Sequence, residues 1–177
     1  MEFDQLMRMR QSCRSYDPER KLSREQMMTI LEAGRLAPSA CNAQPYHFTV
    51  CAGSAACEVA RSVQGLGMNG FAKDVSCFVV ISEEDYNVTA RLGSAHKDQD
   101  YRSVDIGIAT AQMVFAAQNM GIASCILGWF DEGKLQALLH TKRRIRLVLA
   151  LGYAWEGDPL RPKKRKNMSD LVDFLDA

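Results

Sequence analysis

The amino-acid sequence predicts a layered α+β fold, in one domain covering residues 1–177. Strand-like and helical segments follow one another without the regular βαβ alternation of a doubly wound sheet, and the glycine fingerprint of a dinucleotide-binding fold is missing. The chain has 177 residues, of which 47% are hydrophobic and 24% charged. This is the usual size of a single domain with a substantial hydrophobic core.

The N-terminal part is expected to contain two helices joined by an extended turn. Apolar residues at helical spacing favour a helix over residues 3–11. Ser23, followed by Glu25 and Gln26, is an N-cap signal for a second helix, which Ala37 and Pro38 end. A polar loop over residues 39–45 follows that helix.

The rest of the chain alternates between strand and helix patterns, interrupted by two irregular segments. Residues 86–100 are polar and weakly patterned and form a candidate lid, and residues 154–168 form a proline- and lysine-rich crossing segment. The regular elements are expected as strands at 47–52, 75–82, 122–127 and 145–153, helices at 54–63, 104–120 and 131–140, and a glycine-rich loop at 64–70. Because residues 104–120 carry little charge, we expect a helix buried on most faces, either central or at an interface.

Charge and cysteine usage indicate a cytoplasmic protein with neither a nucleic-acid partner nor a membrane partner. The formal net charge is +1, so no global field attracts polyanions, although the region 143–166 is locally basic. Six cysteines without Cys-x-x-Cys spacing, four of them in apolar or small-residue contexts, fit reduced and mostly buried thiols. The N-terminus lacks a signal-peptide pattern, and no apolar run approaches the roughly 20 residues of a membrane helix.

A first candidate site is the basic turn that contains Arg10, Ser12 and Arg14. Two cations around a hydroxyl suit a phosphate dianion. In an extended turn the three side chains project to one side, whereas in a continuous helix Ser12 points away, so the phosphate interpretation requires the helix to end near Arg10. The alternative is a pair of cations that offset a helix dipole by about 0.3 to 1 kcal/mol without any ligand.

Lys163 and Arg165 repeat this alternating basic pattern near the C-terminus. Two similar pairs from opposite ends of the chain can converge on one phosphate. Taken alone, the run from Lys163 to Lys166 is also typical of a solvated basic face or of a nucleic-acid patch.

The loop over residues 38–45 is the most specific of the candidate segments. Two prolines fix its backbone, while Ser39, Asn42 and Gln44 offer a hydroxyl and amides that can approach a flat heteroaromatic ring. The alternative is a polar surface turn.

Histidines and nucleophiles point to no further chemistry. His47, His96 and His140 lie far apart in the sequence and lack ligand spacing with cysteines or carboxylates. We therefore expect no metal site and no serine or cysteine triad.

Together, the turn Arg10-Gln11-Ser12-Cys13-Arg14, the loop Ala37-Pro38-Ser39-Ala40-Cys41-Asn42-Ala43-Gln44-Pro45-Tyr46 and the segment Pro162-Lys163-Lys164-Arg165 resemble the nitroreductase family, over almost the whole chain. The resemblance implies a central, mainly antiparallel sheet flanked by helices, in an intertwined homodimer with flavin mononucleotide (FMN) at the interface. It assigns the FMN phosphate and ribityl chain to Arg10, Ser12, Arg14, Lys163 and Arg165, and contacts from the partner subunit to Pro38, Ser39, Ala40 and Asn42.

The same resemblance places two further segments at the flavin ring. Asn69, after the glycine-rich loop, would meet the polar edge of the ring. The run from Cys125 to Gly128 matches the strand end where a backbone N–H faces flavin N5; this involves Leu127 and Gly128, and the absence of a side chain on Gly128 permits close approach. No side chain is expected to act as a catalytic acid or base.

The resemblance also implies an activity. It is the transfer of hydride from NADH or NADPH onto flavin N5, followed by reduction of a nitroaromatic or quinone-like acceptor in a ping-pong mechanism. Reductive dehalogenation, dehydrogenation of cyclic substrates and flavin breakdown are alternatives on the same fold, and a flavin or nucleic-acid binding module is a non-enzymatic one. The sequence departs from many family members at Tyr46, where they carry Trp, and in the short segment 86–104, so acceptor specificity stays open.

Overall fold

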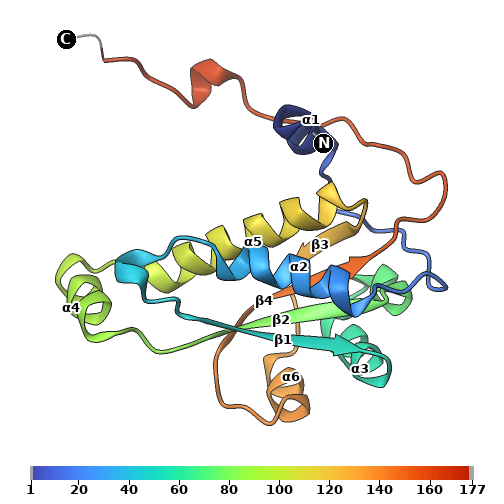
Figure 1. Cartoon of the computed structure of the whole chain (residues 1–177), viewed down its shortest axis with the longest axis horizontal. Helices are drawn as coiled ribbons and strands as arrows, with labels where there is room; N and C mark the ends of the chain where they lie inside the picture. Colours follow the sequence, from blue (N-terminus) through green and yellow to red (C-terminus); the bar gives the residue numbers. More distant parts are fainter. Residues whose placement is uncertain (1, 176–177) are drawn as a thin grey trace.

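The computed structural model describes residues 2–175; Met1 and residues 176–177, the ends of the predicted domain, lie outside the described residues. A four-stranded sheet forms the centre of the structure (Figure 1), in the order β1-β2-β4-β3 with every neighbouring pair antiparallel. Its strands are β1 (Tyr46–Ala52), β2 (Cys77–Glu83), β3 (Ala123–Leu127) and β4 (Ile145–Gly152). The predicted α+β class and the antiparallel sheet are thus confirmed.

Each helix and strand predicted from the sequence is present, with ends that differ by at most three residues. The helices are α1 (Phe3–Met9), α2 (Arg24–Arg35), α3 (Ser54–Val63), α4 (Val88–Lys97), α5 (Tyr101–Asn119) and α6 (Glu132–Leu138), with short 3-10 turns η1 (Ala40–Asn42), η2 (Gly70–Asp74) and η3 (Met168–Asp170). The predicted N-cap of α2 is a complete capping box: Gln26 N donates to Ser23 Oγ over 3.1 Å, and Ser23 N donates to Gln26 Oε1 over 2.9 Å.

Two local predictions need correction. The first helix ends at Met9 rather than at residue 11, because Arg10 already has extended backbone angles (φ −57°, ψ 124°). The candidate lid at 86–100 contains a helix, α4, whose N-cap Asn87 accepts a 2.8 Å hydrogen bond from Ala90 N. Its pattern is weak in the sequence because Ala90 is the one buried residue of α4.

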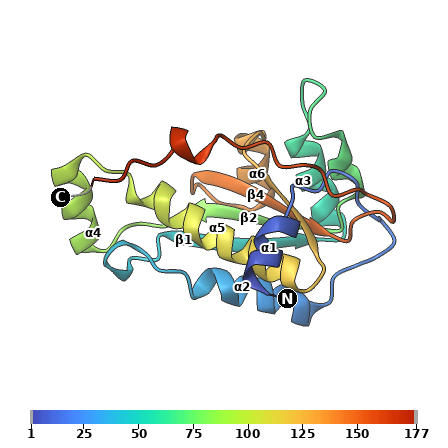
Figure 2. The same ribbon diagram turned by 90° about the horizontal axis from the view of Figure 1, so that it is seen from above.

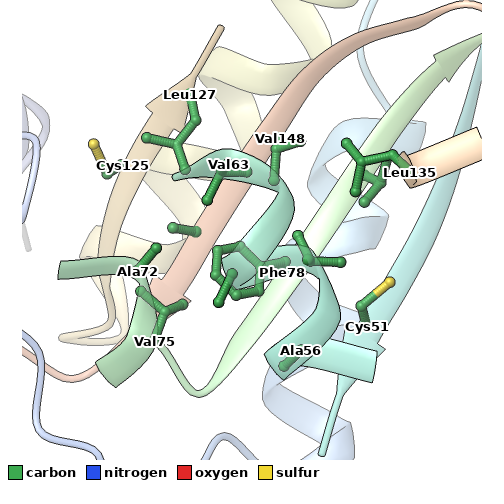
Figure 3. Packing of buried hydrophobic residues seen from close by; sticks show 14 of the residues in the cluster. Cys51, Ala56, Val63, Ala72, Val75, Phe78, Cys125, Leu127, Leu135 and Val148 are labelled. Carbon is green, nitrogen blue, oxygen red and sulfur yellow. The ribbon is translucent and has the colours of Figure 1, made fainter. Parts of the chain in front are cut away.

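Helices cover both faces of the sheet. α2 and α5 pack on one face and α3 and α6 on the other, as Figure 1 shows. Figure 3 shows Phe78 of the central strand β2 among apolar side chains of α3, η2 and β4 on the second face. Phe78 has no exposed surface, and burying a side chain of that size contributes about 1.5 to 3 kcal/mol.

Helix α5 is less completely covered than its sequence predicts. Ile106, Met113 and Ala117 face the core, but Val104 keeps 48% of its surface exposed, and Ala111 is exposed as well. The outward side of α5 therefore offers a face of apolar and small residues, which fits the interface alternative better than the central one.

The C-terminal segment leaves the folded body after β4. Figures 1 and 2 show it running outside the helices and the sheet, and residues 159–175 are exposed throughout. Its side chains are nevertheless partly apolar: Leu171 is 59% exposed, Phe174 86% and Leu175 96%. Exposed apolar side chains of this size are typical of a surface that another chain covers.

All six cysteines are free, and four of them (Cys13, Cys51, Cys77 and Cys125) are buried, as their sequence contexts predict. Among the described residues, no helix is long and apolar enough to cross a membrane.

Replacement of Gly152 by alanine tests how tightly the N-terminal turn packs against β4. A Cβ at this position would lie 2.8 Å from Cδ1 of Tyr16, whose ring is 3% exposed and has no room to move. We expect Gly152→Ala to lower the free energy of unfolding by about 1 to 3 kcal/mol, measured by urea denaturation.

Gly133→Ala is the matched control, because its Cβ would make an ordinary contact with Asp131 at 3.6 Å in helix α6. This variant should be neutral or gain up to about 1 kcal/mol. Equal stabilities of the two variants would contradict the tight packing of Tyr16 on Gly152.

Candidate functional site

The N-terminal turn lies on the edge strand β3 and on the end of β4. Cys13 N donates to Ser124 O over 2.9 Å, and Ser12 pairs with Ser124 in a parallel bridge. Further along the turn, Trp155 N donates to Ser15 O over 2.9 Å. The backbone from residue 12 to residue 15 is therefore fixed on the sheet, and the side chains of Ser12 and Arg14 leave from a defined frame.

The C-terminal segment crosses back over this turn and brings its own cations. The Lys163 amine donates to Arg8 O, at the end of α1. The pKa of Lys163 is lowered, first by desolvation and then by the positive charges of Arg10 and Arg165. Three cations from the two ends of the chain thus lie within electrostatic reach of one another, and a bound dianion would relieve their repulsion.

Arg161 connects the two segments directly. Its Nη2 donates to Ser12 O over 3.1 Å, and its backbone N–H donates to Gln11 Oε1 over 3.0 Å. Asp158 holds the guanidinium through Nη1 over 2.9 Å. Arg161 therefore positions the turn around Ser12 through backbone contacts and adds a positive charge beside it.

A surface groove extends from Arg14 along the 3-10 turn η2. Arg14, Phe71, Lys73 and Trp155 line it. Below it, the thiol of Cys125 has a pKa raised by burial, an effect that the positive charge of Arg14 partly offsets. Arg14 and Lys73 thus give this groove two positive charges against the one carboxylate of Asp74, and Arg14 lies within electrostatic reach of Cys125 in β3.

The end of β3 and the glycine-rich loop are neighbours. A Cβ on Gly65 would lie 3.2 Å from Nε1 of Trp129, which follows directly after Gly128. Gly128 is exposed, and a Cβ there would meet no atom within 4 Å, so the space beside this backbone is open. Asn69 has a left-handed backbone (φ 56°), and its Nδ2 donates to Val63 O over 2.9 Å. Its side-chain oxygen Oδ1 is left for another group.

The loop from Pro38 to Pro45 is held in an unusual backbone conformation. Cys41, Asn42 and Gln44 all have positive φ, at 51°, 50° and 47°. Gln44 N donates to Ser39 Oγ over 3.0 Å, and Gln44 Nε2 donates to Asn42 Oδ1 over 3.2 Å. The polar side chains of this loop therefore fix its shape, and Asn42 remains exposed.

A buried carboxylate anchors the same loop to α5. Both oxygens of Asp105 lie within hydrogen-bonding distance of Ala40 N, at 3.1 and 3.2 Å, and the residue is 3% exposed. Burial raises the pKa of Asp105, and the hydrogen bond from Ala40 N partly offsets that rise. Burial, together with the charge of Asp105, also raises the pKa of Tyr46.

Within one chain, the predicted phosphate residues and the predicted partner-loop residues form two groups at opposite ends of the sheet. The loop 38–42 precedes Tyr46, which pairs with Glu83, whereas the cation cluster lies near Ser124, which pairs with Leu151 at the other end. A seven-residue strand spans about 20 Å, so the two groups do not converge on one point. Arg10, Ser12, Arg14, Lys163 and Arg165 form the first group, and Pro38, Ser39, Ala40 and Asn42 form the second. Leu127 lies between the two groups along the strands, because it pairs with Val148, which pairs with Val80 in the middle of β2. Gly128 follows Leu127, and Trp129 contacts the glycine-rich loop that precedes Asn69.

Three residues of the candidate site were not singled out from the sequence: Lys73, Arg161 and Asp105. Lys73 follows Asn69 by four residues, a spacing that a search for neighbouring cations would find. Asp105 is a charge within an apolar helix, which is itself a signal of a special role. Arg161 has no local signal, because its partner Ser12 lies 149 residues away. Among residues 2–175, no group of three or more His, Cys, Asp or Glu side chains is arranged to hold a metal ion.

A four-stranded antiparallel sheet with helices on both faces is the fold that this chain shares with solved structures of the nitroreductase family. The model of this family, described as the Nitroreductase family, matches residues 7–153. The chain therefore belongs to the nitroreductase family of enzymes.

Individual relatives agree with this assignment. The chain is 28% identical to an oxygen-insensitive NADPH nitroreductase from Helicobacter pylori, over 97% of this chain and 95% of that protein. A nitroreductase-like protein from Streptococcus mutans superposes with a TM-score of 0.84 at 16% identity, covering 98% of both chains. A protein from Exiguobacterium sibiricum, solved in complex with FMN, superposes with a TM-score of 0.81 at 19% identity, covering 99% of this chain and 98% of that one.

The pH dependence of stability tests the buried carboxylate of Asp105. Because burial raises its pKa, the native state binds this proton more tightly than the unfolded state. The contribution of Asp105 to the free energy of unfolding is then greatest below the ordinary pKa of 3.8, and it declines as pH rises through the raised native pKa. In urea denaturation at a series of pH values, Asp105→Asn should remove this decline, so the difference between wild type and variant grows as pH rises.

Asp105→Leu serves as the comparison, because it removes the charge and the acceptor together. Leaving Ala40 N–H without a partner should make it less stable than Asp105→Asn by about 1 kcal/mol. A stability difference between wild type and Asp105→Asn that is constant with pH would contradict the raised pKa.

Proposed function

We propose that residues 1–177 act as one FMN-binding domain in a homodimeric NAD(P)H oxidoreductase. The enzyme takes hydride from NADH or NADPH onto flavin N5 and passes electrons to a nitroaromatic, quinone or similar small acceptor. Membership of the nitroreductase family supports this assignment, as do the NADPH nitroreductase of Helicobacter pylori and the FMN complex from Exiguobacterium sibiricum.

The observation that carries the proposal is the convergence of cations from both ends of the chain. Lys163 lies near Arg10 and Arg165, while Ser12 is held by Arg161. Cationic and hydroxyl donors fit the oxygens of a phosphate dianion, which accept several charge-assisted hydrogen bonds. We assign the FMN phosphate and ribityl chain to Arg10, Ser12, Arg14, Lys163 and Arg165.

The groove beside this cluster suits the flavin ring. The open space next to Gly128 allows the backbone of Leu127 and Gly128 to approach a planar ring. The side-chain oxygen Oδ1 of Asn69 is available to a ring N–H. When bound, the flavin supplies the acceptor and donor of hydride. Lys73 and Arg14 supply positive charge along the groove, which favours negative charge on the reduced ring.

A second copy of the chain completes the site. Within one chain the loop with Pro38, Ser39, Ala40 and Asn42 lies at the far end of the sheet from the cation cluster. The outward face of α5 and the C-terminal segment expose apolar side chains that a partner would bury. A twofold homodimer brings the loop of one subunit to the cation cluster of the other, and intertwines the two chains through the C-terminal segment.

The purified protein should be a yellow dimer with about one FMN per chain, bleached by NADPH or NADH. Arg10→Ala combined with Arg165→Ala should leave a folded dimer that purifies colourless. It loses two charge-assisted contacts, each worth about 1.5 to 3 kcal/mol in binding. Absorbance and mass of the released cofactor measure loading, and sedimentation velocity measures the oligomeric state.

Lys142→Ala combined with Arg144→Ala is the matched control, since it removes the same charge from an exposed turn between α6 and β4. This control should stay fully yellow. A double Arg10 and Arg165 variant that keeps its FMN would refute the phosphate assignment, and a monomeric wild type carrying a full complement of FMN would refute the shared site.

Steady-state kinetics test the order of the two half-reactions. Because one groove serves both substrates in turn, NAD(P)H should leave before the acceptor binds. We expect parallel double-reciprocal lines for NAD(P)H against a nitroaromatic or a quinone. Intersecting lines would show that both substrates bind together and would exclude ping-pong kinetics.

A further inference from the structure

A second cavity lies at the end of the sheet where β1 ends and β2 begins. It has a volume of about 510 Å³ and lies between the first turns of α2 and α3. Its interior is apolar, with Leu22, Met27, Val50, Ala56 and Cys77 among the lining residues. This volume falls in the range of small-molecule sites in proteins, and an apolar wall suits the hydrophobic body of a ligand.

The mouth of this cavity is positively charged. Lys21, Arg24 and Lys73 line it against one carboxylate, Asp74. In the part of the chain from residue 2 to residue 175, no carboxylate oxygen forms an ion pair within 4 Å of any of these three cations. The Lys21 amine donates to the backbone oxygen of Pro18, which does not neutralise its charge, so the positive charge at the mouth remains available for an anion from solution.

Backbone N–H groups add to the positive potential at the mouth of the cavity. Helix α3 starts at the cavity after Gly53, whose missing side chain leaves the first turn without a side-chain cap. The uncapped N–H groups and the positive end of the helix dipole favour a negative group in the same place as the cations. Helix α2 also starts there, but its capping box already engages Gln26 N.

The cavity adjoins the groove assigned to the flavin, and Lys73 lies between the two. None of the twelve candidate flavin residues lines it, although Pro18, Lys73 and Asp74 line both this cavity and the groove beside Arg14. A ligand here would therefore lie next to the flavin groove without occupying it.

We propose that this cavity binds a small amphipathic anion, a carboxylate carried on a short aliphatic or aromatic body. The apolar body lies against Leu22, Met27 and Val50, and the carboxylate lies at the mouth between Lys21 and Arg24. A purely polar anion fits this cavity less well, because it gains nothing from the apolar interior. A neutral apolar molecule also fits less well, because it leaves the cations at the mouth without a partner.

Isothermal titration calorimetry of the purified, flavin-loaded protein tests this proposal with octanoate as the probe. Octan-1-ol is the matched ligand, because it keeps the chain and removes the charge. We expect saturable binding of octanoate that weakens as salt is added, and binding of octan-1-ol at least about tenfold weaker. Equal binding of the two ligands, or no saturable binding of octanoate, would overturn the proposal.

Two variants locate the binding. Lys21→Ala combined with Arg24→Ala should weaken octanoate binding about tenfold or more, whereas the control Lys142→Ala with Arg144→Ala should leave it unchanged. Val50→Trp fills the cavity from an edge strand on which Val50 is 41% exposed, and should abolish binding. FMN content and the thermal midpoint serve as folding controls for each variant. Octanoate affinity that is unchanged in a folded Val50→Trp variant would place the ligand elsewhere and refute the cavity.

Discussion

The backbone contact between the N-terminal turn and β3 determines the rest of the candidate site. One hydrogen bond, from Cys13 N to Ser124 O, turns the segment after α1 into an extra short partner of the sheet edge. With the turn fixed there, Tyr16 packs on Gly152, and Arg14 lines the groove along η2. Arg161, from the C-terminal segment, donates a hydrogen bond to Ser12 O. The outer edge of β3 is thereby paired at Ser124, while Ile126 further along the strand stays 46% exposed.

The other end of the sheet shows a different way to hold functional residues. The loop after α2 contains three non-glycine residues with positive φ, a conformation that costs energy and persists only when its surroundings fix it. Here Ser39, Gln44 and Asp105 supply that fixation through hydrogen bonds to the loop backbone. A rigid presentation of Ala40 and Asn42 is useful if these residues meet a ligand outside their own chain, because little ordering entropy is lost on binding.

The sequence predicts the structure well where an element depends on residues that are close together in the chain. Helix α3 is predicted with the bounds that the structure shows, and the N-cap of α2 is predicted at Ser23, because periodicity and capping are local. The cation pairs and the 38–45 loop were found from motifs, and the structure brings Arg10, Lys163 and Arg165 near one another. Helix α4 was missed because it buries one residue, and Arg161 and Asp105 were missed because their roles come from contacts 149 and 65 residues away. The separation of the cation cluster from the 38–42 loop was also missed, because it depends on the strand order of the sheet, which no single segment of the sequence predicts.

The distance along the chain between the two halves of the cation cluster has a consequence for biosynthesis. The Lys163 amine meets Arg8 O across 155 residues, and Arg161 meets Ser12 across 149. While the chain is being made, residues 8 to 14 remain without these partners until residue 163 has been translated. The sheet itself is closed by β4, which also comes late, so the cluster is assembled after the scaffold rather than with it. A nascent chain that stops before residue 161 therefore carries the opening turn without the contacts from Arg161 and Lys163.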